Sequence, residues 1–214
     1  TTQLCEYLVD HGASVSVFTG VPHYPSWTIT PDDRYRLRSV QRAPRLEIRR
    51  LRHHVPAQQT AARRALYELS FAAHVAVQQP TERPDVVLAV VPSLLSGVVA
   101  GRIARRVGAP LVVWVQDIYT LGMLETAEGG RLSTAVTRCV ERYVLRSADA
   151  VVAIHPRFAN YLTDRMGIDP RKVHIIRNWT HLPPAPTRGK AAARTRLGWP
   201  VAGLLAVHTG NMGA

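Results

Sequence analysis

The chain has 214 residues, 46% of which are hydrophobic, so it is long enough for one full α/β domain with a buried core and an extension. No apolar run reaches the roughly 20 residues that cross a bilayer as a helix, and two cysteines provide no disulfide framework. The formal net charge of +12 comes almost entirely from arginine, since only Lys172 and Lys190 are lysines. Composition therefore argues against a membrane-spanning protein and against a small disulfide-rich scaffold.

The first half of the chain predicts alternating helices and strands. Apolar residues recur at helical spacing from Thr2 to His11, with Gly12 as a fitting C-cap, and small and β-branched residues at 13–19 predict a strand. Residues 20–27 then read as a loop fixed by prolines. The following elements are a strand at 46–51, a helix at 60–79, a strand at 85–91 that is apolar on both faces, and a helix at 94–107.

The second half continues the same pattern. We expect a strand at 111–115, a loop containing Gly129 and Gly130, a helix at 132–146, a strand at 150–154, a helix ending at Met166 and a strand at 173–176. Strands that alternate with helices are typical of a parallel sheet. The expected fold class is therefore α/β, with a Rossmann-like parallel sheet and helices on both faces.

The prolines near the C-terminus divide the chain into three parts. Residues 1–181 are expected to form a Rossmann-like lobe, residues 182–202 a proline-rich linker with a short basic helix, and residues 203–214 the first strand and glycine-rich turn of a second lobe. The first helix has no strand before it, and the glycine-rich turn has no helix after it. We therefore expect that the first lobe lacks its first strand and that the second lobe is truncated.

Ligands of open α/β sheets bind beyond the carboxyl ends of the strands. The residues that follow the predicted strands are therefore candidate site residues. Polar side chains lie at several of these ends: His23, Tyr24, Ser93, Gln116, Asp117, His155 and Asn178. Any of them could instead cap a turn or line a surface loop.

Asp117 is the strongest candidate, because it follows an apolar strand and opens a loop. Its carboxylate could accept a hydrogen bond from a sugar hydroxyl or act as a base; the alternative is a carboxylate that caps a turn. The adjacent Gln116 offers both a donor and an acceptor to a polyol, or is a plain polar strand end.

The sequence defines the roles of the other candidate residues less specifically. His155 could contact a substrate phosphate or hydroxyl, or cap the helix that follows it. His23 and Tyr24 could line an acceptor pocket in which a ring stacks on a sugar, or belong to an ordinary surface loop. Asn178 stands just before the proline-rich linker, where a hinge between lobes is expected, and Trp179 is expected to pack on that linker.

Metal chemistry and nucleophilic catalysis find no support in the sequence. No cluster of His, Cys or carboxylate residues has metal-ligand spacing, and His53 and His54 are adjacent in a strand-like segment, so they should point to opposite faces. No nucleophile–base pair is recognisable. We therefore expect neither a metal nor a cofactor.

Basic residues gather in one short segment: Arg34, Arg36, Arg38, Arg42, Arg45, Arg49, Arg50 and Arg52. Such a segment suits anionic lipid headgroups, a pyrophosphate-bearing substrate or nucleic acid, or it could be a solvated basic face. Neither interleaved aromatic residues nor a nucleic-acid motif accompanies it, so nucleic acid is not expected as a partner.

Ordered segments of the chain carry a family resemblance: 18–25, 84–87, 114–117 with 121–124, 141–146, 175–179 and 208–213. In this order they resemble the GT-B-fold, retaining glycosyltransferases of family 4. More narrowly, they are similar to the bacterial cell-surface polysaccharide transferases that act on fucosamine or colanic-acid units. The resemblance covers essentially the whole chain and points to the N-terminal, acceptor-binding lobe.

The resemblance implies that this lobe holds the acceptor while a C-terminal lobe holds a nucleotide-sugar donor. Gln116 stands where many members carry a histidine that reaches the donor sugar, with the polar Asp117 beside it. The turn that meets the donor phosphate corresponds to Gly210, Asn211, Met212 and Gly213. From their places after predicted strands, we also expect His155 to contact the donor and His23, Tyr24 and Ser93 to contact the acceptor. Such enzymes need no metal, because basic side chains and helix N-termini stabilise the leaving diphosphate.

The implied function is transfer of a sugar from a nucleotide-sugar to a lipid-linked or small-molecule acceptor, by same-face attack with retention of configuration. A cytoplasmic enzyme is expected, bound peripherally to the inner face of the cell membrane through the basic segment at 34–52. The absent first strand, the absent donor lobe and a short loop after Asp117 depart from the family, so this chain alone is expected to be inactive. Two alternatives stay open: a non-catalytic acceptor-binding subunit of a split glycosyltransferase, and a GT-B-like sugar-nucleotide epimerase.

Overall fold

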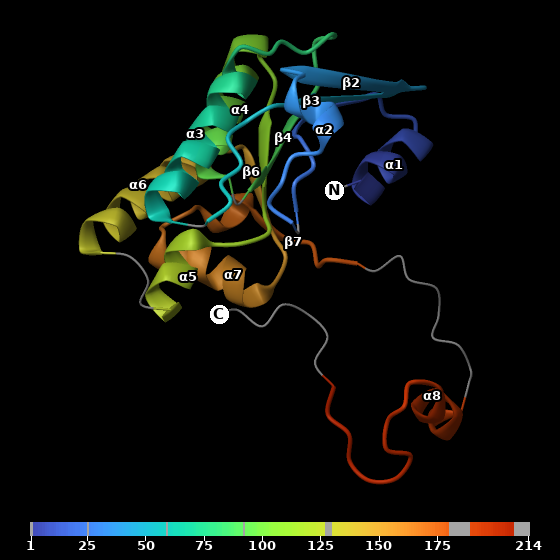
Figure 1. The fold of residues 1–214 in the computed structure, drawn as a ribbon. Coiled ribbons are helices and arrows are strands. Elements are labelled where there is room, and N and C mark those ends of the chain that lie inside the picture. The colour runs from blue at the N-terminus through green and yellow to red at the C-terminus, as the bar shows by residue number, and fades with distance from the viewer. Residues whose placement is uncertain are drawn as a thin grey trace. The chain divides into compact units, whose positions relative to one another are not determined.

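The computed structural model describes residues 2–24, 26–58, 60–91, 93–126, 130–179 and 189–207. The chain divides into two compact units, Thr1–Asn178 and Trp179–Ala214, which we describe separately. The first unit contains the strands and nearly all of the helices (Figure 1).

The first of two sheets has the strand order β1-β3-β2, with β1 at Val15–Gly20, β2 at Arg38–Ala43 and β3 at Leu46–Leu51. β1 and β3 run parallel, as expected, whereas β2 is antiparallel to β3. The sequence analysis did not predict β2, because its residues are mostly polar and exposed and show no apolar face. Two short helices belong to the same region, α1 at Thr2–Asp10 and α2 at Pro31–Arg34.

The second sheet has the order β4-β5-β6-β7, and all its strands run parallel. Its strands are β4 at Val87–Val91, β5 at Leu111–Val115, β6 at Ala150–Ala153 and β7 at Val173–Ile175. This confirms the expected parallel α/β arrangement. The strand expected at 85–91 begins at Val87 in the structure, and it is not buried along its whole length as a central parallel strand would be: Leu88 is 40% exposed, and among the described residues β4 pairs with β5 alone.

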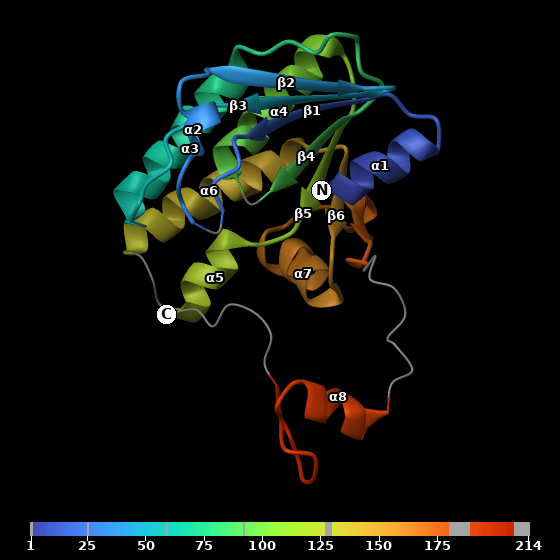
Figure 2. The same ribbon diagram turned by 45° about the vertical axis from the view of Figure 1, so that its right-hand side comes forward.

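The longer helices pack against one another beside the strands. They are α3 at Ala61–Ala76, α4 at Leu94–Val107, α5 at Tyr119–Thr126, α6 at Arg131–Ser147, and α7 at Pro156–Asn160, which continues as a π-helical turn at Tyr161–Arg165. Figures 1 and 2 show α3, α4 and α6 side by side as one layer, with α1 on the other side of the strands. A 3₁₀ turn at Pro170–Lys172 leads into β7. Helix α5 was expected to be a loop.

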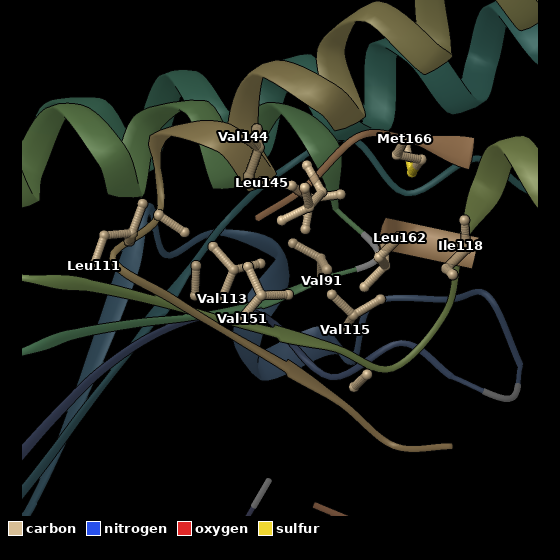
Figure 3. Close-up of a cluster of buried hydrophobic side chains, with 14 of the residues drawn as sticks. Val91, Leu111, Val113, Val115, Ile118, Val144, Leu145, Val151, Leu162 and Met166 are labelled. Carbon is tan, nitrogen blue, oxygen red and sulfur yellow. The ribbon is translucent and has the colours of Figure 1, made fainter. Parts of the chain in front are cut away.

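The core lies between the second sheet and α6 (Figure 3). Leu111, Val113 and Val115 alternate along β5 and are each at most 2% exposed, because β4 and β6 flank this strand on both edges. Val144 of α6 packs over them, and α4 approaches α6 closely at Gly97. A Cβ at Gly97 would lie 2.9 Å from Cγ1 of Val144, so this contact requires glycine.

The second unit contains α8 at Lys190–Arg196, which agrees with the short helix expected after the linker. Arg194 is only 7% exposed, and its guanidinium donates to the carbonyls of Val201 at 3.1 Å and Gly203 at 3.0 Å. The glycine-rich turn at 210–213 lies outside the described residues.

Candidate functional site

Two predicted site residues meet at the carboxyl edge of the second sheet. Gln116 follows β5 and Asn178 follows β7, and the strand order places β6 between them. The Gln116 Nε2 donates to Asn178 Oδ1 at 3.2 Å, and the Asn178 Nδ2 donates to Gln116 Oε1 at 3.0 Å. This reciprocal amide pair ties the chain that follows β7 to the end of β5.

Asp117 is exposed at the same edge, between the amide pair and the start of α5. Its Oδ1 accepts the backbone N–H of Ile118 at 2.9 Å, so it caps the turn as the structural alternative supposed. The second carboxylate oxygen has no hydrogen bond to a described residue and can accept one from a ligand. The capping role therefore does not conflict with a role at the site.

A buried carboxylate that the sequence analysis did not single out as a site residue positions this turn. Glu141 of α6 is 5% exposed and accepts the backbone N–H of Tyr119 at 2.7 Å, together with the N–H and the hydroxyl of Thr120. These donors begin α5, where N–H groups have no partner within the helix. Burial raises the pKa of Glu141, while the hydrogen bonds from Thr120 and Tyr119 oppose the rise.

Helix α3 contributes a second polar layer next to Asp117. The Arg64 guanidinium lies 4.6 Å from the centre of the Tyr119 ring, and Glu68 interacts with the Tyr119 hydroxyl and with the backbone N–H groups of Leu94 and Leu95. Burial raises the pKa of Tyr119 to about 12, and the Glu68 carboxylate adds to this rise. The phenol therefore stays protonated at neutral pH and can donate a hydrogen bond.

An aromatic cluster lies beyond the carboxyl ends of β1 and β3. His23 follows β1, His53 follows β3, and Tyr67 comes from α3; the His23 and His53 rings are 5.2 Å apart, and His53 and Tyr67 are 4.9 Å apart. The Tyr67 hydroxyl lies 3.4 Å from His23 Nε2, and Trp27 contacts His23 at 5.3 Å. Because α3 carries Tyr67 beside Glu68, this helix links the aromatic cluster to the polar layer around Tyr119.

His53 is the buried centre of this cluster, at 6% exposure. Burial lowers its pKa, and the hydrogen bond between its Nδ1 and the Leu51 carbonyl opposes that effect only in part. Gly20 makes room for the ring, since a Cβ there would lie 2.5 Å from His53 Cε1. The neighbouring His54 is exposed, in contrast to His53, and neither residue belongs to a strand.

The remaining predicted residues are more dispersed. Tyr24 is 63% exposed and meets Trp27 edge-on at 6.5 Å, so it does not enter the cluster with His23. The Ser93 hydroxyl is buried at the start of α4 and forms no hydrogen bond to a described residue. His155 caps α7, because its Nδ1 accepts the backbone N–H of Arg157 at 3.1 Å. The predicted donor contacts Gly210, Asn211, Met212 and Gly213 lie outside the described residues.

The eight arginines of the basic segment do not form one surface. Side chains of directly paired residues in an antiparallel ladder share a face, so Arg38, Arg42 and Arg49 lie on the face that carries the buried Leu51, and Arg50 lies on the other face. Glu47 accepts from Arg42 at 2.9 Å and from Arg49 at 2.6 Å, and the Arg49 side chain is only 13% exposed. Hydrogen bonds also hold two further members, Arg45 to the Gly12 carbonyl and Arg50 to Gln41.

The sequence analysis missed several residues of this site. His53 comes two residues after β3, so the strand-end rule would have found it if applied to that strand. Arg64, Tyr67 and Glu68 lie inside a helix, where only the packing of α3 reveals their role. Within the described parts of the chain, no group of His, Cys, Asp or Glu residues has the arrangement of a metal site.

These features define a class: an α/β lobe with polar and aromatic side chains beyond the carboxyl ends of parallel strands, as in proteins that bind sugars or nucleotides there. The chain belongs to the glycosyl transferase 4-like domain family, which it matches over residues 1–179. WcaI of Escherichia coli (strain K12), named as a colanic acid biosynthesis glycosyl transferase, is 26% identical over 225 residues. That match covers 100% of this chain and 54% of WcaI, so the chain spans about half the length of this curated relative.

Solved structures support the fold. Sucrose-phosphate synthase from Thermosynechococcus elongatus matches with a TM-score of 0.57 at 20% identity, over 92% of this chain and 46% of the synthase. A second structure of this synthase matches with a TM-score of 0.53 at 18% identity, over 84% of each chain. The fold is therefore that of the N-terminal lobe of a GT-B enzyme. Among the described residues, no helix has the length and apolar character needed to cross a membrane.

Proposed function

We propose that this lobe binds the acceptor in a glycosyltransferase that moves a sugar from a nucleotide-sugar to a lipid-linked or small-molecule acceptor with retention of configuration. Membership of the glycosyl transferase 4-like family supports the reaction class. The observation that supports the site most directly is the exposed Asp117 carboxylate, held between the Gln116–Asn178 pair and the first turn of α5.

In this proposal, the free oxygen of Asp117 accepts a hydrogen bond from a hydroxyl of the reacting sugar. Gln116 can exchange its bond with Asn178 for one to the substrate, since an amide offers both donor and acceptor. His23 and Tyr24 contact the acceptor, and the rings around His23 provide a wall on which a sugar can stack, whereas the buried Ser93 hydroxyl is not among the proposed contacts. Asn178 is the hinge to a donor-binding lobe, and Gly210–Gly213 with His155 meet the donor phosphates.

Contact with an anionic membrane through the basic segment is part of the same proposal. Arg34, Arg36, Arg38 and Arg52 are its members that form no ion pair or side-chain hydrogen bond with a described residue. They would carry this contact, and replacing them with glutamine should weaken liposome binding.

The test uses the enzyme as its natural source produces it, incubated with a panel of nucleotide-sugars and of lipid-diphosphate or small-molecule acceptors. We expect a new glycosidic product whose anomeric configuration, read by NMR, equals that of the donor. Asp117→Asn should lower the rate about 100-fold or more if the carboxylate assists proton movement. The matched control, Asp164→Asn, changes an exposed carboxylate outside the site and should keep the rate.

Other outcomes would replace the proposal. A nucleotide-sugar that changes stereochemistry without any acceptor would identify an epimerase. Acceptor binding without transfer from any donor would identify a non-catalytic subunit. An inverted product would retain the transferase and overturn the same-face mechanism.

A further inference from the structure

Tyr119, two residues after Asp117, is held at three points by side chains of two other helices. Its backbone N–H donates to the buried Glu141 of α6 at 2.7 Å. Its hydroxyl donates to the Glu68 carboxylate of α3, and the Arg64 guanidinium, one turn earlier on the same helix, covers the ring at 4.6 Å from its centre. We call Arg64, Glu68 and Glu141 together the Tyr119 clamp.

Burying the two carboxylates of the clamp costs free energy. Glu68 is 9% exposed and Glu141 5% exposed, and burial raises the pKa of both carboxyl groups, while hydrogen bonds oppose the rise. Neither carboxylate forms an ion pair with a described residue. Apolar side chains of the same shape often replace such buried polar pairs without loss of stability. Stability alone therefore does not account for the clamp.

Glu68 has a second contact, at the start of α4, where it accepts the backbone N–H groups of Leu94 and Leu95. A helix start is commonly capped by its own N-cap serine, and Ser93 stands at that position. The Ser93 hydroxyl is instead buried and forms no hydrogen bond to a described residue. A local cap was therefore available to α4, and the contact that requires the Glu68 carboxylate is the one with Tyr119.

The clamp fixes the turn that carries Asp117. Only Ile118 separates Asp117 from Tyr119; it is 3% exposed, and its N–H donates to Asp117 Oδ1 at 2.9 Å. On the other side of Asp117 lies β5, which β4 and β6 hold along both edges. The direction of the Asp117 carboxylate is therefore restrained from both sides, by the sheet before it and by the clamped tyrosine after it.

We propose that Glu68 and Tyr119 are positioning residues for sugar transfer, which hold the free oxygen of Asp117 toward the reacting sugar through the turn at Ile118. Glu141 completes this support from the side of α6. The inference rests on the role given to Asp117 in the proposed function, and it requires no contact between the clamp and the substrate. Reacting groups need to be held within about 0.5 Å of their productive position, so loss of one clamp contact should act on turnover more than on binding.

The first test measures transfer by the enzyme in the form that its natural source produces, with the donor and acceptor identified as above. Tyr119→Phe keeps the ring under Arg64 and removes the hydroxyl that Glu68 accepts, so kcat should fall about tenfold while KM for the acceptor stays within about twofold. Glu68→Gln keeps an acceptor for the phenol and should retain more of the rate than Glu68→Ala. The matched control is Tyr7→Phe, which removes a phenol hydroxyl from a tyrosine that is 58% exposed on α1 and should keep kcat.

Hydrogen exchange at the Ile118 amide gives a second readout that needs no substrate, because this N–H donates to Asp117 itself. Tyr119→Phe and Glu68→Ala should speed exchange at Ile118 about tenfold, since local opening of the turn becomes easier. Exchange at Val113, which is fully buried in β5, should stay unchanged and verifies that the fold is kept.

The proposal requires both a lower kcat and faster Ile118 exchange in Tyr119→Phe, and either result without the other overturns it. A raised KM with kcat kept also overturns it, because the phenol would then contribute to substrate binding. Failure of the proposed function is a different result, in which the parent enzyme transfers no sugar from any donor. Exchange at Ile118 still decides in that case whether the clamp holds Asp117, and unchanged exchange would overturn the clamp as well.

Discussion

The side-chain amides of Gln116 and Asn178 exchange two hydrogen bonds, of 3.2 and 3.0 Å, although 62 positions separate the residues in sequence. The pair connects the end of β5, where Asp117 is exposed, to the last residue of the first compact unit. Each amide is therefore held in part by the other.

A double-mutant cycle tests this connection. Gln116→Ala and Asn178→Ala should each lower the free energy of unfolding, and the two together should show a coupling of about 1 kcal/mol, as two partly exposed neutral hydrogen bonds provide. Urea unfolding of the four proteins measures it. Strictly additive effects would mean that the amide pair contributes no net stability.

Glu141 should be important for stability, because it satisfies the N–H groups that begin α5. Glu141→Ala leaves those buried donors without a partner and should lower the free energy of unfolding by about 3 kcal/mol. Glu141→Gln keeps an acceptor oxygen and should cost less. Hydrogen exchange should locate the effect at the amides of Tyr119 and Thr120.

The control for this prediction is Glu125→Gln. Glu125 forms an exposed ion pair with Arg157, and such surface pairs contribute at most about 1 kcal/mol. A loss at Glu125 as large as the loss at Glu141 would contradict the proposed role of burial and helix capping.

His53 should make stability depend on pH. Its pKa in the folded protein lies below the ordinary value of 6.5, so between these two values the unfolded chain binds more protons than the folded chain. Stability contributed by neutral His53 is therefore complete above about pH 6.5 and is lost as the pH falls, with a slope of at most about 1.4 kcal/mol per pH unit.

Unfolding free energies measured across this range, for the parent and for His53→Gln, test that expectation. The variant should be less stable at neutral pH and should show a flatter dependence on pH. If both proteins lose stability equally on acidification, another group is responsible.

Gly97 should not tolerate a larger side chain, because α4 and α6 meet there. Gly97→Ala places a Cβ 2.9 Å from Val144, and the resulting shift should cost about 1–3 kcal/mol. Gly122→Ala in α5 is the matched comparison, since a Cβ there meets nothing within 4 Å. Alanine favours a helix over glycine by about 0.8–1 kcal/mol, so this variant should be slightly more stable. Thermal unfolding distinguishes the two outcomes.

The local sequence pattern was sufficient to predict a helix or strand wherever the segment is apolar or has a regular hydrophobic period. The bounds of β3, α4 and β5 were predicted as the structure has them, because the alternating pattern of β3, the apolar run of β5 and the glycine after α4 are readable without knowledge of neighbours. The parallel direction of the second sheet followed from helix–strand alternation, and the strand-end rule found Gln116, Asp117 and Asn178 at one edge.

Elements and contacts that depend on residues far away in the chain could not be predicted from the sequence. β2 is a strand because it pairs with β3, although its own residues are polar. Helix α5 begins where Glu141 of α6 supplies an acceptor 22 residues away, and this start was not predicted from the sequence. In the same way, Tyr67 and Glu68 of α3 reach His23 and Tyr119 only after the helix has packed against β3 and α4.

The sequence by itself thus determined the fold class and the edge of the sheet at which a ligand is expected, since these follow from hydrophobic periodicity. It also indicated the family, through the resemblance of its ordered segments to known glycosyltransferases. The structure decided how charges are distributed. It places Arg38, Arg42 and Arg49 on one face of the β2–β3 ladder and Arg50 on the other, and it pairs Glu47 with Arg42 and Arg49. The physical reason is that the direction of a side chain depends on strand register and helix packing, and both are set by contacts between residues far apart in the chain.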